Sequence, residues 1–276
     1  MPNTTRTEVY CAIVFMVAAL LGACSSMNST SLTSPSAAAR AELAPSGKLR
    51  AAINFGNPIL ATRDAATGKP RGLSVDLARE LGRRLGAPVE LVIFTAAGKV
   101  VEGIKSGEWD IAFFAIDPVR AADTDFSTAY VVIEGAYLVP QDSPITRLDD
   151  VDREGVRVVV GRGSAYDLYL TRELKKARLT RAATSQAVTD TMLSEKIEVA
   201  AGVKLQLQAD VKRVPRVRLL EGRFMVINQA MAIPKGRPAG AAYATEFIEE
   251  MKSAGFVADA LKRHNIEGAM VAPPAR

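Results

Sequence analysis

The chain has 276 residues, with 35 Lys and Arg, 30 Asp and Glu, one His and two Cys, and a formal net charge of +5. Aromatic residues make up only 6%, and no basic block alternates with them, so the composition argues against a nucleic-acid-binding protein. The sequence contains no Cys/His metal-binding spacing, no G-x-S-x-G and no P-loop, so it predicts neither a cofactor nor a metal site.

Residues 9–23 form a continuous apolar run that leads to Cys24. The run is shorter than the ~20 residues of a membrane-spanning helix and matches the apolar core of a secretory signal. Its end, Leu-Leu-Gly-Ala-Cys, resembles a bacterial lipobox, which implies cleavage before Cys24 and diacylation of its thiol. The alternative is an uncleaved membrane anchor. We therefore predict a signal peptide over 1–23 and a protein of the periplasm or cell surface, held at the membrane by lipid.

Residues 24–46 are rich in Ser, Thr, Ala and Pro and show no apolar periodicity. This composition predicts a flexible tether without secondary structure. Cys11 lies in the predicted signal peptide, so the mature chain is expected to have no free thiol and no disulfide.

The first part of the remaining chain alternates strands with helices. We predict strands over 48–55, 88–94 and 110–116, the last of them fully apolar and buried. Leucines recur every four residues within 71–86, at Leu73, Leu77, Leu81 and Leu85. They predict an amphipathic helix that Gly86 ends, and residues 98–109 predict a second helix. This order predicts a parallel sheet covered by helices.

A second α/β unit follows. The predicted elements are a strand, glycine turn and helix over 156–177, a helix over 185–195, strands over 196–202, 214–222 and 224–234, and two helices over 241–264 that are broken at Gly255. Residues 130–144 and the segment around Asn228 fit two crossovers between the units. We therefore predict two α/β lobes, 47–140 with 228–276 and 141–227, with a ligand cleft between them.

The order of these segments resembles the extracellular solute-binding proteins of ABC transporters, in the polar amino-acid family. The most specific motifs are the helix Gly-Leu-Ser-Val-Asp-Leu-Ala-Arg-Glu-Leu over 72–81, and Ser-Gly-Glu-Trp-Asp over 106–110 followed by an apolar strand, x-P-x-R and Asp-Phe-Ser-x-x-Tyr. The resemblance covers nearly all of 47–268. It implies a monomer that closes two lobes on a small molecule and delivers it to an ABC permease.

Arg120 is the arginine of the x-P-x-R segment, and the resemblance implies that it binds a carboxylate of the ligand. A guanidinium suits that role because it is always charged and presents a planar fork. The alternative is a surface ion pair with Asp117, Asp123 or Asp125. We expect Asp117, where relatives often carry threonine, to orient Arg120 from the side. It could instead receive a donor from the ligand.

The turn at Gly163 and Ser164 is implied to bind the same carboxylate from the second lobe. Gly163 permits a close approach, Ser164 is a plausible N-cap, and free N–H groups at a helix start favour an anion. An ordinary capped helix is the alternative. Four further residues complete the predicted ligand-binding set, either as ligand contacts or as turn, core and hinge residues: Asn54, Asn57, Phe114 and Gln229.

The sequence departs from the family where the ligand's α-ammonium is bound. The matching position falls at about Val203, and the nearest acid and amide are Glu198 and Gln206. A buried ammonium without a carboxylate partner is unfavourable. We therefore predict that the ligand is a small carboxylate-bearing metabolite, an amino acid or a related compound, and that the protein prefers a carboxylate or other polar anion over an ordinary zwitterionic α-amino acid.

Catalysis by a dehydratase-like enzyme on the same fold is an alternative function, and a ligand sensor for a membrane signalling partner is another. General acid–base chemistry needs a positioned carboxylate or histidine. The one histidine, His264, is expected to face solvent or to act as a cation at a helix end. We therefore expect no enzymatic activity.

Overall fold

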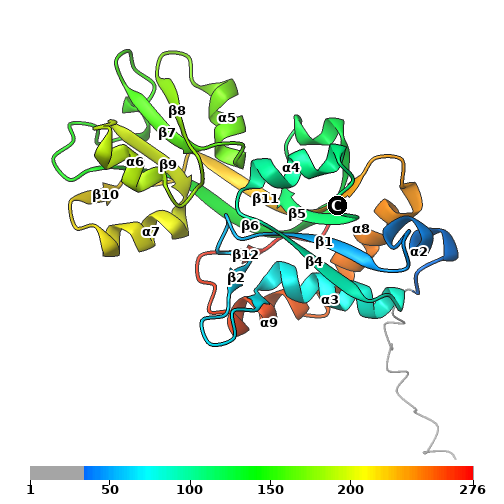
Figure 1. Ribbon diagram of the computed structural model, residues 1–276. Coiled ribbons are helices and arrows are strands. Elements are labelled where there is room, and N and C mark those ends of the chain that lie inside the picture. The colour runs from blue at the N-terminus through cyan, green and yellow to red at the C-terminus, as the bar shows by residue number, and fades with distance from the viewer. Residues whose placement is uncertain (1–33, 276) are drawn as a thin grey trace, which may run out of the picture. The chain divides into compact units, whose positions relative to one another are not determined.

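The computed structural model describes residues 34–275. The predicted signal peptide and the lipidation site at Cys24 lie outside these described residues. Between residues 34 and 275, no helix is both long and apolar enough to cross a membrane. This part of the chain folds into two α/β lobes linked by two long strands (Figure 1).

The first lobe combines N-terminal elements with the C-terminal helices. Its strands are β1 (Leu49–Asn54), β4 (Val89–Phe94), β5 (Ile111–Ala115) and the short pair β2 (Thr62–Arg63) and β3 (Pro70–Arg71). Its helices are α2 (Ala37–Leu43), α3 (Leu73–Leu85), α4 (Ala97–Lys105), α8 (Pro238–Ser253) and α9 (Phe256–Arg263). The predicted strands and helices are confirmed here, and Gly86 ends α3 in the left-handed conformation with a φ of 64°.

The second lobe lies at the left of Figure 1. Its strands are β7 (Arg157–Gly161), β8 (Arg178–Ala182), β9 (Val199–Val203) and β10 (Val217–Leu219), and its helices are α5 (Ala165–Glu173), α6 (Val188–Ser194) and α7 (Lys204–Arg213). The sequence pattern does not indicate β8 or α7. The first is a partly exposed edge strand, and the second begins Lys-Leu-Gln-Leu-Gln, an alternation that looks like a strand.

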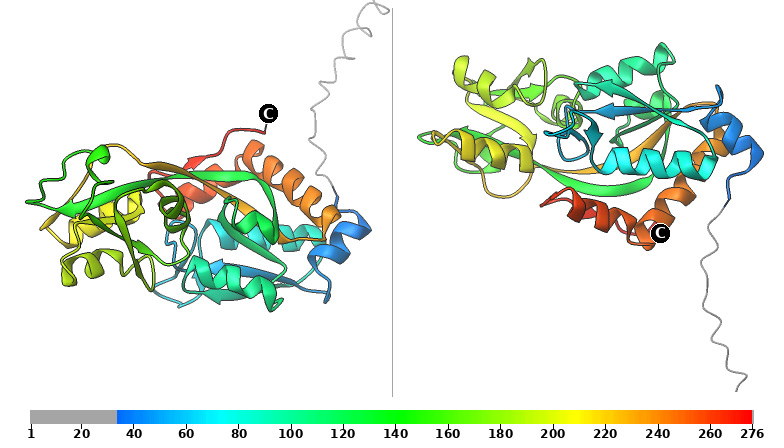
Figure 2. Two further views of the ribbon diagram at one scale, coloured as in Figure 1. Left: turned by 90° about the horizontal axis from the view of Figure 1, so that it is seen from above. Right: turned by 60° about the horizontal axis from the view of Figure 1, so that its bottom comes forward.

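One ten-stranded sheet runs through both lobes. Its order is β4-β1-β5-β11-β6-β9-β7-β8, with β10 and the short β12 (Met270–Val271) also paired to β6. The two strands that cross between the lobes are β6 (Thr124–Pro140) and β11 (Met225–Pro234), which run antiparallel to each other. Both views of Figure 2 show them side by side along the molecule.

The prediction of a parallel sheet is only partly right. In the first lobe β4, β1 and β5 are parallel, but β11 pairs with β5 in the antiparallel sense. The reason is that β11 returns from the second lobe and so enters the sheet in the opposite direction. The carboxyl ends of β1 and β5 therefore meet the crossover strands at the junction of the lobes.

The prediction of an unstructured tether over 24–46 is wrong for the part that forms α2. Ser36 caps this helix through a bond from the Ala39 N–H to its Oγ at 3.1 Å. Ala39 and Leu43, four residues apart, are buried in the core of the first lobe. The segment is helical because α8 covers its apolar side, a contact that local composition does not reveal.

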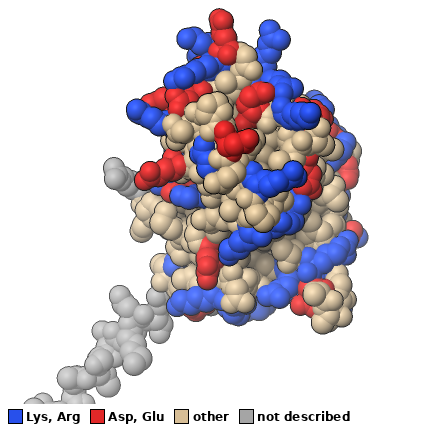
Figure 3. Space-filling model, turned by 90° about the vertical axis from the view of Figure 1, so that its left-hand side faces the viewer, with Lys and Arg blue, Asp and Glu red and all other residues tan. Residues whose placement is uncertain are grey.

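Separate hydrophobic cores lie in the two lobes. The largest gathers side chains of α3, β1, β5, α8 and α9, whereas two others surround β7 and β9. A smaller cluster of Ile59, Ala115, Ile133 and Ile227 lies where the crossover strands meet the first loop. On the face drawn in Figure 3, basic and acidic side chains are interspersed, as expected for a solvated surface.

Candidate functional site

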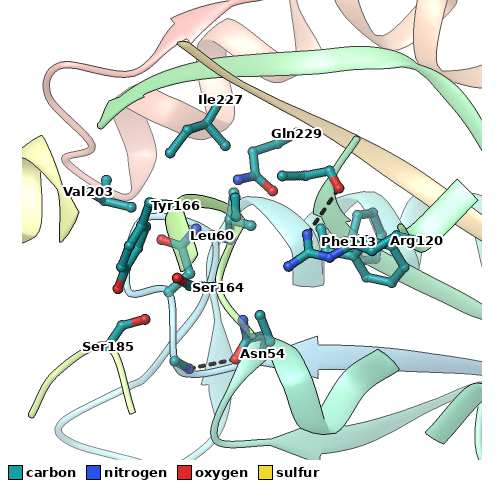
Figure 4. Close-up of a pocket in the computed structure, with 16 residues that line it drawn as sticks. Asn54, Leu60, Phe113, Arg120, Ser164, Tyr166, Ser185, Val203, Ile227 and Gln229 are labelled. Carbon is teal, nitrogen blue, oxygen red and sulfur yellow. Dashed lines mark hydrogen bonds between the residues drawn. The ribbon is translucent and has the colours of Figure 1, made fainter. Parts of the chain in front are cut away.

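A small cavity lies between the lobes, at the carboxyl ends of β1 and β5 (Figure 4). It has a free volume of about 40 Å³, enough for a few water molecules. The first lobe and the crossover strands line it with Asn54, Gly56, Asn57, Leu60, Ala97, Phe113, Phe114, Ala115, Arg120, Ile227 and Gln229, and the second lobe with Ser164, Ala165, Tyr166, Ser185 and Val203.

Arg120 is buried at this cavity, with 2% of its surface exposed. Its Nη1 donates to the Ala115 carbonyl at 3.0 Å and its Nη2 to the Gly163 carbonyl, across the cleft, at 2.9 Å. The guanidinium also lies over the Phe114 ring, 5.1 Å from its centroid. Within residues 34–275, its Nε has no hydrogen-bond partner and no carboxylate pairs with it. Burial lowers the pKa of Arg120 to about 10, so it remains charged at neutral pH.

Asp117 does not orient Arg120 through a hydrogen bond. Its Oδ2 accepts from Nη2 of Arg172 in α5 at 2.9 Å, and its Oδ1 accepts from the Val119 N–H at 2.9 Å. The carboxylate is buried yet does not line the cavity. The surface alternative for Arg120 also disagrees with the geometry, because Arg120 is buried and Asp117 is paired elsewhere.

The turn before α5 is arranged differently from the expectation. Ser164 caps the helix by accepting from the Asp167 N–H at 3.0 Å, as predicted. However, the Gly163 N–H donates to the Asp167 carboxylate at 2.8 Å, so it is not free for an anion. Gly163 instead turns its carbonyl toward Arg120, in a left-handed conformation with a φ of 68°. The remaining first-turn N–H groups at the cavity are those of Ala165 and Tyr166, which have no intrahelical acceptor.

The two predicted asparagines both line the cavity and both form turns. Asn54 Oδ1 accepts from the Gly56 N–H at 2.8 Å, and Asn57 Oδ1 accepts from the Ile59 N–H at 3.2 Å. Their side-chain oxygens are therefore engaged in the turns, and their side-chain N–H groups are the donors available to a ligand. Each asparagine can thus form a turn and contact a ligand at the same time.

Gln229 and Phe114 also reach the cavity from adjacent strands. Gln229, on β11, is 3% exposed, and its Oε1 has no hydrogen-bond partner among the described residues. Its amide points into the cavity in Figure 4. Phe114 packs edge-on against Trp109 and Phe126 and so belongs both to the core and to the cavity wall.

Sequence reasoning missed two hydroxyl groups of the second lobe, those of Tyr166 and Ser185. Tyr166 and Ser185 lie with Ser164 on the same side of the cavity (Figure 4). Burial raises the pKa of the Tyr166 hydroxyl, so it stays protonated and can donate. Tyr166 follows the predicted cap Ser164 by two residues, which was a usable signal. Ser185 comes from a distant loop and has no such signal.

No Asp, Glu or His lines the cavity in the described part of the chain, and Arg120 is its one charged residue there. Val203 does lie at the cavity, as expected. Glu198 instead pairs with Arg157, with 2.8 Å between Nη2 and Oε1, and Gln206 lies at another surface pocket. The cavity therefore combines one buried cation with neutral hydrogen-bonding groups.

His264 does not line the cavity and is the C-cap of α9. It is not solvent-facing, because its side chain is only 13% exposed and its Nε2 lies 2.9 Å from Asp76 Oδ2. Its Nδ1 lies 3.3 Å from an Arg71 nitrogen. Between residues 34 and 275, no group of three or more His, Cys, Asp or Glu side chains is placed to hold a metal ion.

The sequence profile of the bacterial extracellular solute-binding proteins, family 3, matches residues 49–266, which include both sides of the cavity. The chain belongs to this family. The resemblance noted from its motifs is thereby confirmed, and membership of an extracellular family makes this solute-binding protein an exported one.

Named relatives agree with this assignment. A glutamine-binding protein of Geobacillus stearothermophilus is 27% identical over 122 residues, 43% of this chain and 46% of that protein, so the match spans about half of the relative. The crystal structure of a solute receptor for L-cysteine of Neisseria gonorrhoeae superposes with a TM-score of 0.72 at 24% identity, covering 83% of this chain and 94% of that one.

A third relative is the ancestral amino acid-binding protein AncCDT-1, described as a precursor of cyclohexadienyl dehydratase. Its structure has a TM-score of 0.68 at 22% identity and covers 81% of this solute-binding protein and 97% of its own chain. The two structural similarities establish the two-lobed fold of a periplasmic binding protein.

Proposed function

We propose that this solute-binding protein captures a small carboxylate-bearing metabolite by closing lobes 47–140 with 228–276 and 141–227 on it, and delivers it to an ABC importer. The observation that carries the proposal is Arg120, a buried guanidinium that faces the cavity with an unpartnered Nε and no carboxylate partner within residues 34–275. A buried charge is strongly favoured to acquire a counter-ion. A solute carboxylate supplies one.

The relatives support an amino acid or a compound of related size as the solute. They are described as binding glutamine and L-cysteine, both of which carry a carboxylate. The cavity of this protein differs from what an α-ammonium requires, because no acid lines it in the described residues. The amide and hydroxyl groups of Gln229, Tyr166 and Ser185 suit a neutral polar group. A hydroxy or keto acid therefore fits the cavity better than a zwitterion.

A solute larger than a few water molecules enters only when the lobes separate, because the free volume is about 40 Å³. The crossover strands β6 and β11 are the covalent links about which such a movement takes place. Lobe closing would then bring Ser164, Tyr166 and Ser185 against a solute held by Arg120.

The deciding experiment is mass spectrometry of small molecules released from the purified, denatured protein. We expect a carboxylate without an α-ammonium group, and calorimetry should show that it binds more tightly than the common L-amino acids. Tight, saturable binding of a standard L-amino acid would contradict the preference. Conversion of the solute to a product would indicate the enzyme alternative.

The lipid anchor is proposed from the lipobox resemblance at Cys24. Intact-mass analysis of protein extracted from membranes should show a chain that begins at Cys24 and carries a diacylglyceryl increment. Cys24→Ser should abolish membrane association. An unmodified chain that retains residues 1–23 would refute the anchor.

A further inference from the structure

An ion pair outside the cavity joins the two lobes. Nη2 of Arg172, on α5 of the second lobe, donates to Oδ2 of Asp117 at 2.9 Å. The Asp117 side chain is 5% exposed and that of Arg172 38%. Neither residue lines the cavity. Because Asp117 Oδ1 also holds the Val119 N–H, the pair ties α5 to the loop that carries Arg120.

The pair also bears on the charge that a solute meets. Asp117 is three residues before Arg120, and its carboxylate acts electrostatically on that guanidinium, raising the pKa of Arg120 against the larger effect of burial. An unpaired carboxylate at this place would repel an anionic solute. Arg172 neutralises it, and can do so only when the lobes are together, since Asp117 and Arg172 come from different lobes.

We propose that the Asp117–Arg172 pair couples lobe closing to anion binding: as the lobes meet, Arg172 pairs with Asp117 and leaves the positive charge of Arg120 to the solute. The proposal rests on the proposed function, because it requires an anionic solute. Arg172 is then a positioning residue that raises affinity without contacting the solute.

The pair could also act as a purely mechanical link between the lobes, here called a clamp. Charge coupling and a clamp predict different losses of solute affinity when each partner is removed. Arg172→Gln removes the clamp and leaves the Asp117 charge uncompensated near Arg120. Asp117→Asn removes the clamp and the repulsive charge together, and keeps an oxygen to accept from the Val119 N–H. Charge coupling therefore predicts unequal losses, whereas a clamp predicts equal ones.

The test combines binding with a measurement that needs no solute. Binding is measured by calorimetry on the full chain, with the tightest binder among pyruvate, L-lactate, acetate and succinate as the probe. Distances between the lobes are measured without solute by double electron–electron resonance between two spin labels. The spin labels are placed at Lys105→Cys on α4 and Lys176→Cys after α5, in a full chain that carries Cys11→Ser and Cys24→Ser. Arg178→Gln, an exposed arginine of the same lobe for which the described residues show no ion pair, is the matched control.

We expect Arg172→Gln to weaken probe binding about tenfold and Asp117→Asn about threefold, with the double variant at the level of Asp117→Asn. Both single variants should shift the distances between labels toward longer values, and Arg178→Gln should change neither quantity. Circular dichroism should show the same folded content in all variants, because both side chains lie outside the hydrophobic cores.

Equal losses in the two single variants and the double variant would overturn the charge coupling. Unchanged distances would overturn the link between the lobes. If none of the four acids binds to the wild-type protein, the solute identified by mass spectrometry replaces them as the probe, and a solute without a carboxylate would refute both the proposed function and the charge coupling. The distance measurement would still decide whether the ion pair holds the lobes together.

Discussion

The two ends of β5 each carry a buried charge, and the two charges are treated in opposite ways. Asp110, just before the strand, is fully buried and accepts from Arg50 at both oxygens, at 2.8 and 3.0 Å, with Arg237 at 3.3 Å. Arg120, after the strand, bonds two carbonyls and keeps a bare Nε. A buried charge that is fully paired with opposite charges serves the stability of the fold. A buried charge without a counter-ion, such as Arg120, is available to bind a solute.

Removing Asp110, the charge that is fully paired, should have the largest effect, and we expect that effect on the stability of the fold. Asp110→Ala removes the buried acceptor of Arg50 and Arg237, whose own side chains are 26% and 24% exposed, so we expect the free energy of unfolding to fall by about 3 kcal/mol. Urea denaturation followed by circular dichroism measures it. The affinity of any Asp110→Ala protein that remains folded should match the wild type. A selective loss of affinity at unchanged stability would reverse the assignment of the two ends.

Removing Arg120, the charge without a counter-ion, should instead affect binding. Arg120→Ala should weaken solute binding by about 2–5 kcal/mol, because a desolvated solute carboxylate loses its partner. Arg120→Lys should lose most of that affinity, since an ammonium cannot replace the planar fork. Calorimetry with the released solute measures both variants. Wild-type affinity in Arg120→Ala would remove this residue from the site.

A carboxylate added to the cavity should change its ligand preference, because the cavity would then hold a negative charge as well as Arg120. Val203 lines the cavity and is the N-cap of α7, a position that accepts aspartate well. We expect Val203→Asp to favour L-alanine or L-cysteine and to weaken a simple carboxylate by about tenfold. Val203→Asn is the neutral control. A thermal-shift panel of zwitterions and simple acids compares them, and an unchanged order of preference would contradict the proposed ligand class.

A paired charge near solvent should show the smallest effect. Hydrogen bonds from Lys204 and Arg223 lower the pKa of Glu134, on β6, below its usual 4.5. A carboxyl with a lowered folded-state pKa stabilises the fold above its unfolded pKa, and this stabilisation is lost as pH falls through the folded pKa. Below about pH 4.5 the wild type should therefore lose about 0–1 kcal/mol relative to Glu134→Gln. Parallel denaturation curves from pH 7 to 3 test this, and a constant difference would refute it.

Local periodicity explains what the sequence could predict of the fold. The leucines of α3, the glycine at its end and the apolar β5 each carry their signal within a few residues. The helix α2 does not, because its apolar residue Leu43 packs in the core of the first lobe with α8, which begins almost 200 residues later in the chain. Strand β8 has two exposed arginines and resembles a loop until β7 pairs with it.

The candidate site divides in the same way. Arg120, Ser164 and Gln229 could be placed at the cavity because motifs and strand ends position them. The partner of Asp117 could not, because Arg172 is 55 residues away and meets it only through lobe contact. The role of the Gly163 carbonyl could not be predicted for a related reason: it accepts from Arg120, 43 residues away in the chain, only through contact between the lobes.

The placement of α2 determines which lobe receives a force applied at the start of the described chain. Glu42, in this helix, accepts from the Gly240 N–H at 2.7 Å through its carboxylate, and its carbonyl accepts from Arg237 at 3.0 Å. Leu43 beside it is fully buried. A force applied at residue 34 is therefore transmitted through α2 to α8 and the first lobe. In a chain fastened upstream of residue 34, α2 would connect the point of attachment to the first lobe, and the second lobe would be linked to that point through β6 and β11.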